Sequence, residues 1–468
     1  MKVAFGDPPM QYLRFTQALS SPNIGILYLI SYLRKMNNQV QTYYIQPYLN
    51  LKQHIEKLKQ ISPDLYGISF ANSLQNRAYN TIKHVRKNFP TIPIICGGAC
   101  PSADPEGVLN NSDADICIIG EGEVTSHELV DFYMNNKSDL HKIPGIAFRD
   151  NDQIIKTPPR PLIKDLDTIP MPAWDIINFS NYSGITLKKK SPDTCIVSSR
   201  GCPFNCTFCS NPVWKANKPW LRARSPKNIA EEIQYLYGRG IREIYIRADE
   251  FNINPKWCIE VCEEIQKLDL KGMYFQCNLR ADNFPEELAK AMHDANFWMV
   301  HLGIESGNQR CLDGINKRIT IKSILDTCQK LKKYKIKTFG FFMMFNIWEE
   351  NNNLQFESPK EVKHTFAFAR YLLRHKLISN ISWGFATPMP GAKLYQIAKK
   401  YKIIKPNLKE TSPWEITVNL PNVSEKTMLS IRRKGMILQG LYGILSGNLN
   451  WRNWRHILSK VKYILKSF

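Results

Sequence analysis

The chain lacks the features that mark several large protein classes. No apolar run among its 468 residues reaches the length of about 20 that crosses a bilayer. The N-terminus reads as a short strand and a turn, without the apolar core of a signal peptide. The twelve cysteines are therefore expected to be thiols or metal ligands in a cytoplasmic protein, and not a disulfide framework. These absences disfavour a membrane channel and a secreted disulfide scaffold.

Acidic residues are scarce, with 41 Asp and Glu against 63 Lys and Arg, which gives a net charge of +22. A surplus of this size favours an acidic partner, such as a nucleic acid, an anionic lipid surface or a phosphate-bearing substrate. A generic basic surface is the alternative. Residues 401–468 are expected to form a small helical basic region, and residues 427–468 contain no acidic side chain at all.

This C-terminal stretch has apolar residues at helical spacing with basic residues between them. The apolar ones are Trp451, Trp454, Ile457, Leu458, Val461, Ile464, Leu465 and Phe468, and the basic ones are Arg452, Arg455, Lys460, Lys462 and Lys466. Such a helix packs on the preceding domain with its basic face in water, or it lies in a membrane interface on the inner face of the membrane. Nucleic acid is the least favoured partner, because no recognition module is evident.

Three cysteines, Cys202, Cys206 and Cys209, lie close together in one loop at the spacing C-x3-C-x2-C. Thiolates are the ligands of iron–sulfur clusters, which normally take four of them. Three leave one iron open to bind a small molecule. A zinc site is the alternative, but zinc loops usually pair one C-x2-C with a second pair or with histidines, and no such pair is nearby. The loop therefore predicts a cluster with one open iron.

The first 150 residues alternate short apolar strands with amphipathic helices. Strands are expected at 2–5, 39–45, 65–69, 92–96 and 116–119, and helices at 24–35, 51–60 and 77–88. This alternation predicts βαβ units in a doubly wound, Rossmann-like α/β domain, which binds its ligand at the carboxyl ends of the parallel strands. Those ends are at 6–9, 69–75, 97–102 and 120–123. No G-x-G-x-x-G follows the first strand, so a dinucleotide is disfavoured.

The remainder of the chain predicts a linker and a second α/β domain. Residues 151–190 are rich in proline and have no sustained periodicity, as is typical of a linker. Six strands, near 195–197, 244–246, 274–277, 298–304, 338–345 and 381–386, then alternate with helices. Residues 191–400 are therefore expected to form a partial (β/α)6 barrel whose reactive groups lie at the carboxyl ends of its strands.

The cysteine loop, with Gly201, Asn205 and Phe208 around its thiols, resembles the signature of the radical S-adenosylmethionine (radical SAM) enzymes. The resemblance implies a [4Fe–4S] cluster on the three cysteines and SAM on the fourth iron. One electron then cleaves SAM to a 5′-deoxyadenosyl radical, which takes a hydrogen from the substrate. By the same resemblance, SAM is bound by Phe208, Asp249, Glu250, Arg280, Glu305 and Ser306. One segment departs from the family, since residues 346–350 replace its Gly-x-Pro-x-Glu turn.

The segments at 63–69, 94–98 and 115–123 resemble the cobalamin-binding domain that precedes many radical SAM domains. The resemblance implies that cobalamin is bound by Pro8, Pro9, Ser69, Ser73, Leu74, Gly97, Gly98, Glu121, Gly122 and Glu123. The motif D-x-H-x-x-G, whose histidine ligates cobalt in methionine-synthase-like domains, does not occur. His54 and His84 are expected to be surface histidines on helices. Any cobalamin is therefore expected to bind without a protein imidazole on cobalt.

Together the two resemblances imply a cobalamin-dependent radical SAM enzyme. A C-methyltransferase is expected, in which methylcobalamin delivers its methyl group to an unactivated carbon of a small-molecule or lipid-like substrate. The alternative is a ring closure, oxidation or rearrangement without methyl transfer. A non-catalytic cobalamin- or SAM-binding regulator is disfavoured, because a sensor needs no open iron. The expected electron donor is a flavodoxin or a ferredoxin.

Overall fold

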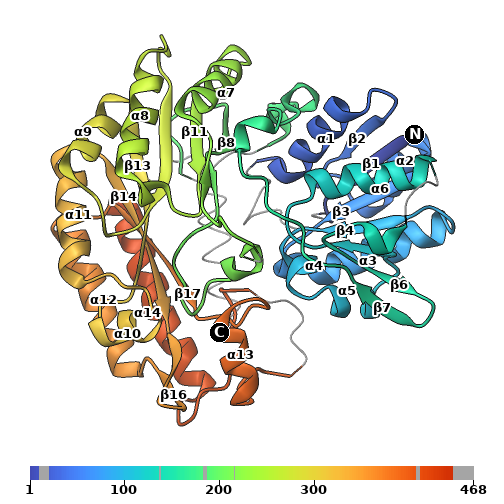
Figure 1. The fold of residues 1–468 in the computed structure, drawn as a ribbon. Helices are drawn as coiled ribbons and strands as arrows, with labels where there is room; N and C mark the ends of the chain where they lie inside the picture. The colour runs from blue at the N-terminus through green and yellow to red at the C-terminus, as the bar shows by residue number, and fades with distance from the viewer. Residues whose placement is uncertain (10–20, 136–138, 183–186, 216, 407–411, 446–468) are drawn as a thin grey trace. The chain divides into compact units, whose positions relative to one another are not determined.

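The computed structural model describes the chain except for residues 10–20, 136–138, 183–186, 216, 407–411 and 446–468 (Figure 1). The described residues form two compact units. The first contains the N-terminal strand, most of the chain up to residue 182, and residues 210–222; the second contains residues 187–209 and those from 223 onward. None of the helices in these ranges is both long enough and apolar enough to cross a membrane. The C-terminal stretch with Trp451 and Trp454 lies outside the described residues, so its membrane contact stays a prediction.

The first unit is built on a seven-stranded sheet in the order β2-β1-β3-β4-β5-β6-β7. Its parallel part comprises β1 (Lys2–Gly6), β2 (Gln41–Ile45), β3 (Leu65–Ser69), β4 (Ile94–Gly97) and β5 (Ile116–Ile118). The order 2-1-3-4-5 is that of a flavodoxin-like doubly wound sheet, which confirms the predicted fold class. An antiparallel edge of β6 (Ile146–Asp150) and β7 (Gln153–Lys156) follows. Sequence reasoning did not predict this edge, and β7 lies in the expected linker.

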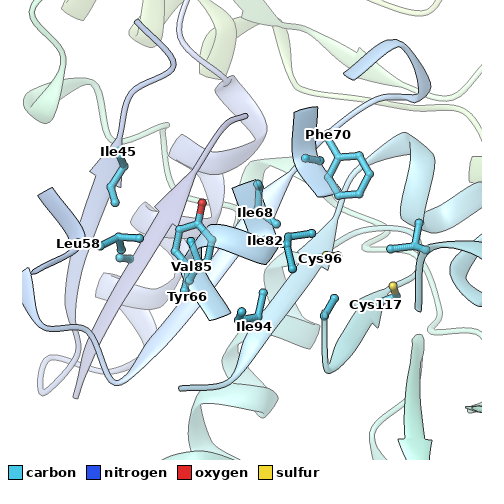
Figure 2. Close-up of a cluster of buried hydrophobic side chains, with 14 of the residues drawn as sticks. Ile45, Leu58, Tyr66, Ile68, Phe70, Ile82, Val85, Ile94, Cys96 and Cys117 are labelled. Atoms are coloured by element: carbon cyan, nitrogen blue, oxygen red, sulfur yellow. The ribbon is translucent and has the colours of Figure 1, made fainter. Parts of the chain in front are cut away.

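Helices cover both faces of this sheet. One face packs on α1 (Ile24–Met36) and α6 (Glu123–Asn135), and the other on α2 (Leu51–Ile61), α3 (Gln75–Asn88), α4 (Ala99–Ala103) and α5 (Pro105–Asn111). Figure 2 shows the second of these cores, where Leu58, Ile82 and Val85 of the helices meet Tyr66, Ile68 and Cys96 of the strands. A helix face with apolar residues at i, i+3 and i+4 supplies this contact.

The structure corrects the prediction for His54, which is completely buried and not on the surface. His54 shares one face of α2 with Ile55, Leu58 and Ile61, and its Nε2 lies 2.9 Å from the hydroxyl of Tyr66. Its Nδ1 is buried without a hydrogen-bond partner. Burial disfavours the charged imidazolium and lowers the pKa of His54 to about 4. The helical spacing of residues 54, 58 and 61 was the signal for this burial.

The second unit is built on six parallel strands in the order β17-β14-β13-β12-β11-β8, which confirms the expected (β/α)6 arrangement. They are β8 (Asp193–Val197), β11 (Glu243–Arg247), β12 (Tyr274–Leu279), β13 (Phe297–Glu305), β14 (Lys337–Met344) and β17 (Asn380–Phe385). The short strands β9 (Ser199–Arg200) and β10 (Arg222–Ala223) flank the segment that contains the cysteine loop. The carboxyl ends of all six parallel strands share one edge of the sheet.

The helices of this unit lie mostly along one outer face of the sheet, and α13 lies apart from them (Figure 1). They are α7 (Pro226–Gly238), α8 (Pro255–Gln266), α9 (Glu286–Asp294), α10 (Gln309–Gly314), α11 (Ile321–Lys333), α12 (Pro359–Arg374), α13 (Lys393–Lys400) and α14 (Glu425–Leu445). Because successive strand residues point to opposite faces, Ile244 and Ile246 are buried on the helix side. Tyr245 and Arg247 therefore lie on the inner face.

The segment that departs from the family motif forms a β-hairpin. Strand β15 (Ile347–Glu350) pairs antiparallel with β16 (Asn353–Phe356). The two turn residues between them, Asn351 and Asn352, have positive φ angles of 49° and 59°, which asparagine tolerates better than most residues. Trp348 of β15 is buried, and the guanidinium of Arg310 lies 4.8 Å from its ring centroid. This wall of the unit is therefore a packed hairpin in place of the family's turn.

Candidate active site

The cysteine loop follows β8 and β9 at the carboxyl edge of the second sheet. All twelve cysteines are free thiols, and only Cys202, Cys206 and Cys209 are partly exposed while the other nine are buried. Hydrogen bonds fix the loop at both ends: the amide of Gly201 donates to Asp249 Oδ2 at 2.6 Å, and the amide of Cys209 donates to the carbonyl of Cys206 at 3.1 Å. The three predicted ligands are thus presented together, from an ordered loop.

The three thiols do not converge on one point. Within the described ranges, no group of three or more His, Cys, Asp or Glu side chains is placed to hold a single metal ion. An iron–sulfur cluster does not require such convergence, because each of its cysteines binds a different iron. Burial, together with the carboxylates of Glu250 and Asp249 and the thiol of Cys209, raises the pKa of Cys202 to about 11. A bound cation would favour the thiolate form.

Arg280 follows β12 and reaches the cysteine loop, while its predicted contact with SAM stays a prediction. Its side chain is buried, and its Nη1 donates toward Cys206 Sγ at 3.9 Å. The guanidinium lies 3.6 Å from the ring centroid of Phe204, and its Nε is 2.7 Å from Asp282 Oδ1. Its Nη2 donates to the carbonyl of Lys317. Arg280 therefore places a fixed positive charge beside a cluster ligand.

Glu305 ends β13 in a left-handed conformation with φ 63°, and its carboxylate pairs with Lys317 Nζ at 2.9 Å. Both side chains are buried. Burial opposes the charge of Lys317, but the carboxylate of Glu305 and the sulfur of Cys206 raise its pKa above the ordinary value. A Cβ on Gly303 would lie 2.7 Å from Glu305 Oε1 and 2.8 Å from Lys317 Nζ. Glycine at this position therefore makes room for the ion pair.

Glu250 contributes an acceptor that the fold leaves unused. Its Oε1 is buried and has no hydrogen-bond partner. Burial raises the pKa of Glu250 to about 7, while the charges of Lys317 and Arg280 oppose the rise. A buried carboxylate oxygen without a partner is costly, so this atom suits a ligand that donates a hydrogen bond. The amino group of SAM is such a donor, so the residues present fit the predicted cofactor.

The other two residues predicted to bind SAM have different surroundings. Phe208 lies in the cysteine loop, packs against Cys311 and Trp348, and lies with its ring centroid 5.8 Å from Lys317 Nζ. Ser306 is fully buried, and its hydroxyl donates to Glu357 Oε1 at 2.9 Å and accepts from the amide of Asn308. The structure thus brings Phe208 to the site but engages Ser306 in an internal network. The contact of Ser306 with SAM stays a prediction.

Sequence reasoning missed Lys317 and Phe204. Phe204 lies between Cys202 and Cys206, so its position within the cysteine motif was a signal that could have identified it. Lys317 follows α10 beside a second basic residue, Arg318, and neither periodicity nor a motif singles it out. Only the three-dimensional pairing with Glu305 identifies it.

In the first unit, the loops predicted to bind cobalamin share the carboxyl edge of the parallel strands. Pro8 and Pro9 directly follow β1 and are buried. Gly97 ends β4, and its carbonyl accepts from the amide of Phe70 at 3.0 Å. Gly98 has φ 98°, and a Cβ there would lie 2.8 Å from the carbonyl of Phe70 and 3.0 Å from Ser69 Oγ. The ends of β3 and β4 are therefore closely packed, and glycine is needed at position 98.

The remaining predicted cobalamin residues lie on two further loops. Ser73 is exposed and Leu74 partly buried on a short helical turn, Asn72–Leu74, whose Asn72 Oδ1 is buried without a hydrogen-bond partner. Glu121 follows β5 and pairs with Arg222 at 2.9 Å.

Gly122 precedes α6, and the buried Glu123 begins it. A Cβ on Gly97 or Gly120 would meet no atom within 4 Å. The free space beside the backbone of Gly97 and Gly120 and the unpartnered Oδ1 of Asn72 lie at one edge of the sheet, and they fit a large ligand such as cobalamin.

The four histidines of this unit lie outside the loops that are predicted to bind cobalamin. His54, His84 and His127 lie on α2, α3 and α6, and His141 lies on a short turn near the start of β6. His54 contacts Tyr66, and His127 lies 3.5 Å from Asp131. The absence of a protein imidazole on cobalt stays a prediction.

Comparison with known proteins supports both the cluster-binding unit and the cobalamin-binding unit. The Radical SAM superfamily matches residues 196–356, and the B12 binding domain matches residues 13–130. An uncharacterized methyltransferase of Pyrococcus horikoshii is 29% identical over 423 residues, which cover 87% of this chain and 88% of that protein. The anaerobic magnesium-protoporphyrin IX monomethyl ester cyclase of Rubrivivax gelatinosus is 30% identical over 385 residues, or 80% of this chain and 66% of that one.

The fold is also similar to that of a solved protein. The structure of the cobalamin-dependent S-adenosylmethionine radical enzyme OxsB with aqua-cobalamin and S-adenosylmethionine bound has a TM-score of 0.73. The two share 17% sequence identity, and the match covers 99% of this chain and 70% of that one.

Proposed function

Since this chain belongs to the cobalamin-dependent radical SAM enzymes, we propose that it is a methyltransferase that acts on an unactivated carbon of a small-molecule substrate. The observation that carries the proposal is the juxtaposition of three partly exposed cysteines with Arg280 and Glu250 at one edge of the sheet. Likeness to a methyltransferase over 87% of the chain supports the choice of reaction.

Different residues of the chain would bind the cluster and cobalamin. Cys202, Cys206 and Cys209 would hold a [4Fe–4S] cluster, and the glycine-containing loops of the first unit would hold cobalamin. When bound, the cluster supplies the electron that cleaves SAM, and cobalamin supplies the methyl group. An electron donor such as a flavodoxin or a ferredoxin would reduce the cluster.

The buried charges around the cysteines position the cofactor's polar groups. Arg280 donates toward a cysteine sulfur, and Glu250 offers an unused acceptor to an amino group. The Glu305–Lys317 pair keeps both its charges satisfied inside the protein. Such fixed polar groups in a partly dry site act more strongly than they would in water.

A second candidate is a cobalamin-assisted ring closure without methyl transfer. The observation that favours it is the 30% identity with the anaerobic magnesium-protoporphyrin IX monomethyl ester cyclase over 80% of this chain. Both reactions would use the same cysteines and the same SAM site. They differ in whether the product gains a methyl group.

The mass of the product distinguishes the two. The anaerobically purified chain, loaded with cobalamin and a reductant, would be incubated with methyl-deuterated SAM and small-molecule extracts of the cells that make it. The methyltransferase proposal expects one compound to gain a labelled methyl group, and the same compound to stay unlabelled with the Cys206→Ala variant. A product that loses hydrogen without gaining label would establish the ring-closing alternative and overturn the methyltransferase.

A further inference from the structure

Four aromatic rings form a continuous row on the inner face of the second unit's sheet. The ring of Tyr245 on β11 stacks on that of His301 on β13, with centroids 4.7 Å apart and planes 20° apart. His301 in turn lies 5.9 Å from Phe341 and 5.4 Å from Phe339, both on β14. The two phenylalanines meet edge to face at 4.8 Å. The row therefore crosses the middle of the sheet from one strand to another.

A hydrogen-bonded support holds His301 within this row. The side-chain amide nitrogen of Gln276 donates to Glu243 Oε1 at 2.5 Å, and also to the carbonyl of Leu187. The oxygen of Gln276 therefore faces His301 Nε2, at 2.8 Å, and accepts from it. Burial, and to a lesser extent the charge of Arg247, lower the pKa of His301 to about 4. The central ring of the row is thus neutral and held in one orientation.

Glu243 anchors this support at the amino end of the sheet. Besides Gln276, it accepts from the indole of Trp298 at 2.7 Å and from the amides of Lys189 and Lys190 at 2.5 and 2.6 Å. A buried carboxylate with four donors is satisfied by the protein itself. It therefore belongs to the scaffold beneath the row and needs no ligand.

One end of the row carries a cation, Arg247, that no carboxylate of the described residues neutralises. Arg247 follows Tyr245 on the same face of β11, and its guanidinium lies 5.3 Å from the Tyr245 ring centroid. Its side chain is exposed, and among the described residues no carboxylate forms an ion pair with it. The row also keeps an open apolar surface, because Phe341 is 39% exposed. The row thus presents an exposed aromatic ring, Phe341, on β14 and an arginine without an ion pair among the described residues, Arg247, next to Tyr245 at its other end.

The row is continuous with the candidate active site. Arg247 lies two residues before Asp249, which holds the cysteine loop through the amide of Gly201. A ligand bound on the row would therefore lie next to the edge at which SAM is expected. The face of the sheet with Tyr245 and Arg247 is the inner one, opposite the buried Ile244 and Ile246.

We propose that this inner face binds the substrate, and that the substrate is a planar conjugated ring that carries a carboxylate or a phosphate. The inference rests on the proposed radical SAM function and names its substrate class. The ring would lie against Phe341 and its neighbours, since aromatic faces favour flat conjugated partners. The anionic group would pair with Arg247, whose planar fork matches both carboxylate and phosphate.

Binding of simple probes tests the proposal directly. The anaerobically reconstituted full chain would be titrated, by equilibrium dialysis, with 2-naphthoate, 2-naphthyl phosphate, the neutral 2-naphthamide and the non-aromatic cyclohexanecarboxylate. We expect at least one naphthyl anion to bind about tenfold more tightly than the amide, as one charge-assisted hydrogen bond allows. Cyclohexanecarboxylate should bind more weakly than 2-naphthoate. The better of the two naphthyl anions then identifies the anionic group.

Three variants in the row and two control variants locate the site. Arg247→Ala should abolish the preference for the anion over the amide, and Arg247→Lys should restore part of it. Phe341→Ala should weaken all naphthyl probes about tenfold. The matched controls are Arg370→Ala and Tyr371→Ala on α12, which remove an exposed arginine and a 46% exposed aromatic away from the row. These two should bind every probe as the unmodified chain does.

The proposal is overturned if Arg247→Ala keeps the anion preference, or if the α12 variants lose binding to the same extent. Iron content and SAM cleavage are measured on the same preparations. If the unmodified chain binds the probes but does not cleave SAM, the result would contradict the proposed function and leave the proposed binding site on the inner face intact. If SAM cleavage is normal but the Arg247 and Phe341 variants bind the probes as the unmodified chain does, the result would overturn the proposed substrate class and leave the proposed function intact.

Discussion

The guanidinium of Arg280 lies 3.9 Å from the sulfur of Cys206 and 3.6 Å from the ring centroid of Phe204. The arginine comes from the end of β12, whereas the cysteine and the phenylalanine belong to the loop after β9. A buried cation is thereby held against one of three thiols expected to bind iron. Charges and hydrogen bonds at the sulfur ligands are among the factors that set the reduction potential of a cluster.

Replacing Arg280 by Met should lower the reduction potential of the cluster, by on the order of tens of millivolts, because the reduced cluster loses a favourable positive charge. Iron content should be retained. An EPR-monitored potential titration measures the shift, and Arg280→Lys should reverse part of it. The control is Arg242→Met, which removes an arginine stacked 4.2 Å from Tyr237 at the amino end of β11. An equal shift in both variants would contradict the assignment.

Replacing Gly303 by Ala should weaken SAM binding by about tenfold, because overpacking of this kind typically costs about 1–3 kcal/mol. The new methyl group would lie 2.7 Å from Glu305 and 2.8 Å from Lys317 and would displace their ion pair. The dissociation constant of SAM, measured under anaerobic conditions, reports the effect. Gly238→Ala is the matched control, since a Cβ there meets nothing within 4 Å. Unchanged SAM affinity in Gly303→Ala would place the cofactor elsewhere.

The buried His54 makes stability depend on pH. Its pKa is lowered to about 4 from the model-compound value of 6.5, so between these values the unfolded chain holds a proton that the folded chain does not. Stability should therefore fall as the pH drops from 6.5 to 4, by up to about 3 kcal/mol from this residue. In His54→Gln, which keeps a hydrogen-bond partner for Tyr66, this component should vanish.

Urea unfolding of both chains across this pH range tests the prediction. The difference in unfolding free energy between the unmodified chain and His54→Gln should narrow as the solution becomes more acidic. A difference independent of pH would mean that His54 is protonated equally in both states.

The coordination of cobalt gives a fourth prediction. None of the four histidines of the first unit lies on the loops at the carboxyl edge, so cobalamin bound there should have no imidazole of this unit on cobalt. We expect the EPR hyperfine pattern of the bound cob(II)alamin to be the same in chain made with ¹⁴N- or ¹⁵N-histidine. A pattern that changes with the histidine isotope would show protein ligation and contradict this expectation.

Local sequence signals were sufficient for most of the fold. Strand 65–69 was predicted with the bounds that β3 has, because an apolar run ends at polar residues on both sides. Helix α2 extends one residue beyond its predicted end and begins with a capping box between Asn50 and Gln53. The cysteine loop is equally local, since its three ligands lie within eight residues of one another.

Features that depend on distant partners could not be predicted. The pairing of Lys317 with Glu305 spans α10, and a single lysine has no periodic signal. Strand β7 has only two apolar residues, Ile154 and Ile155, and is a strand because β6 lies beside it. The prediction for His54 was wrong for a different reason: its helical spacing was visible, but a polar residue type was taken as a surface residue.

The most direct test of the central claim is the formation of 5′-deoxyadenosine from SAM by the anaerobically reconstituted, chemically reduced chain. The account predicts that the unmodified chain and Cys328→Ala, which alters a buried thiol on α11, both form it. Cys206→Ala should bind less iron and form none. Equal formation of 5′-deoxyadenosine in Cys206→Ala and the unmodified chain would contradict the assignment of the cysteine loop as the cluster site.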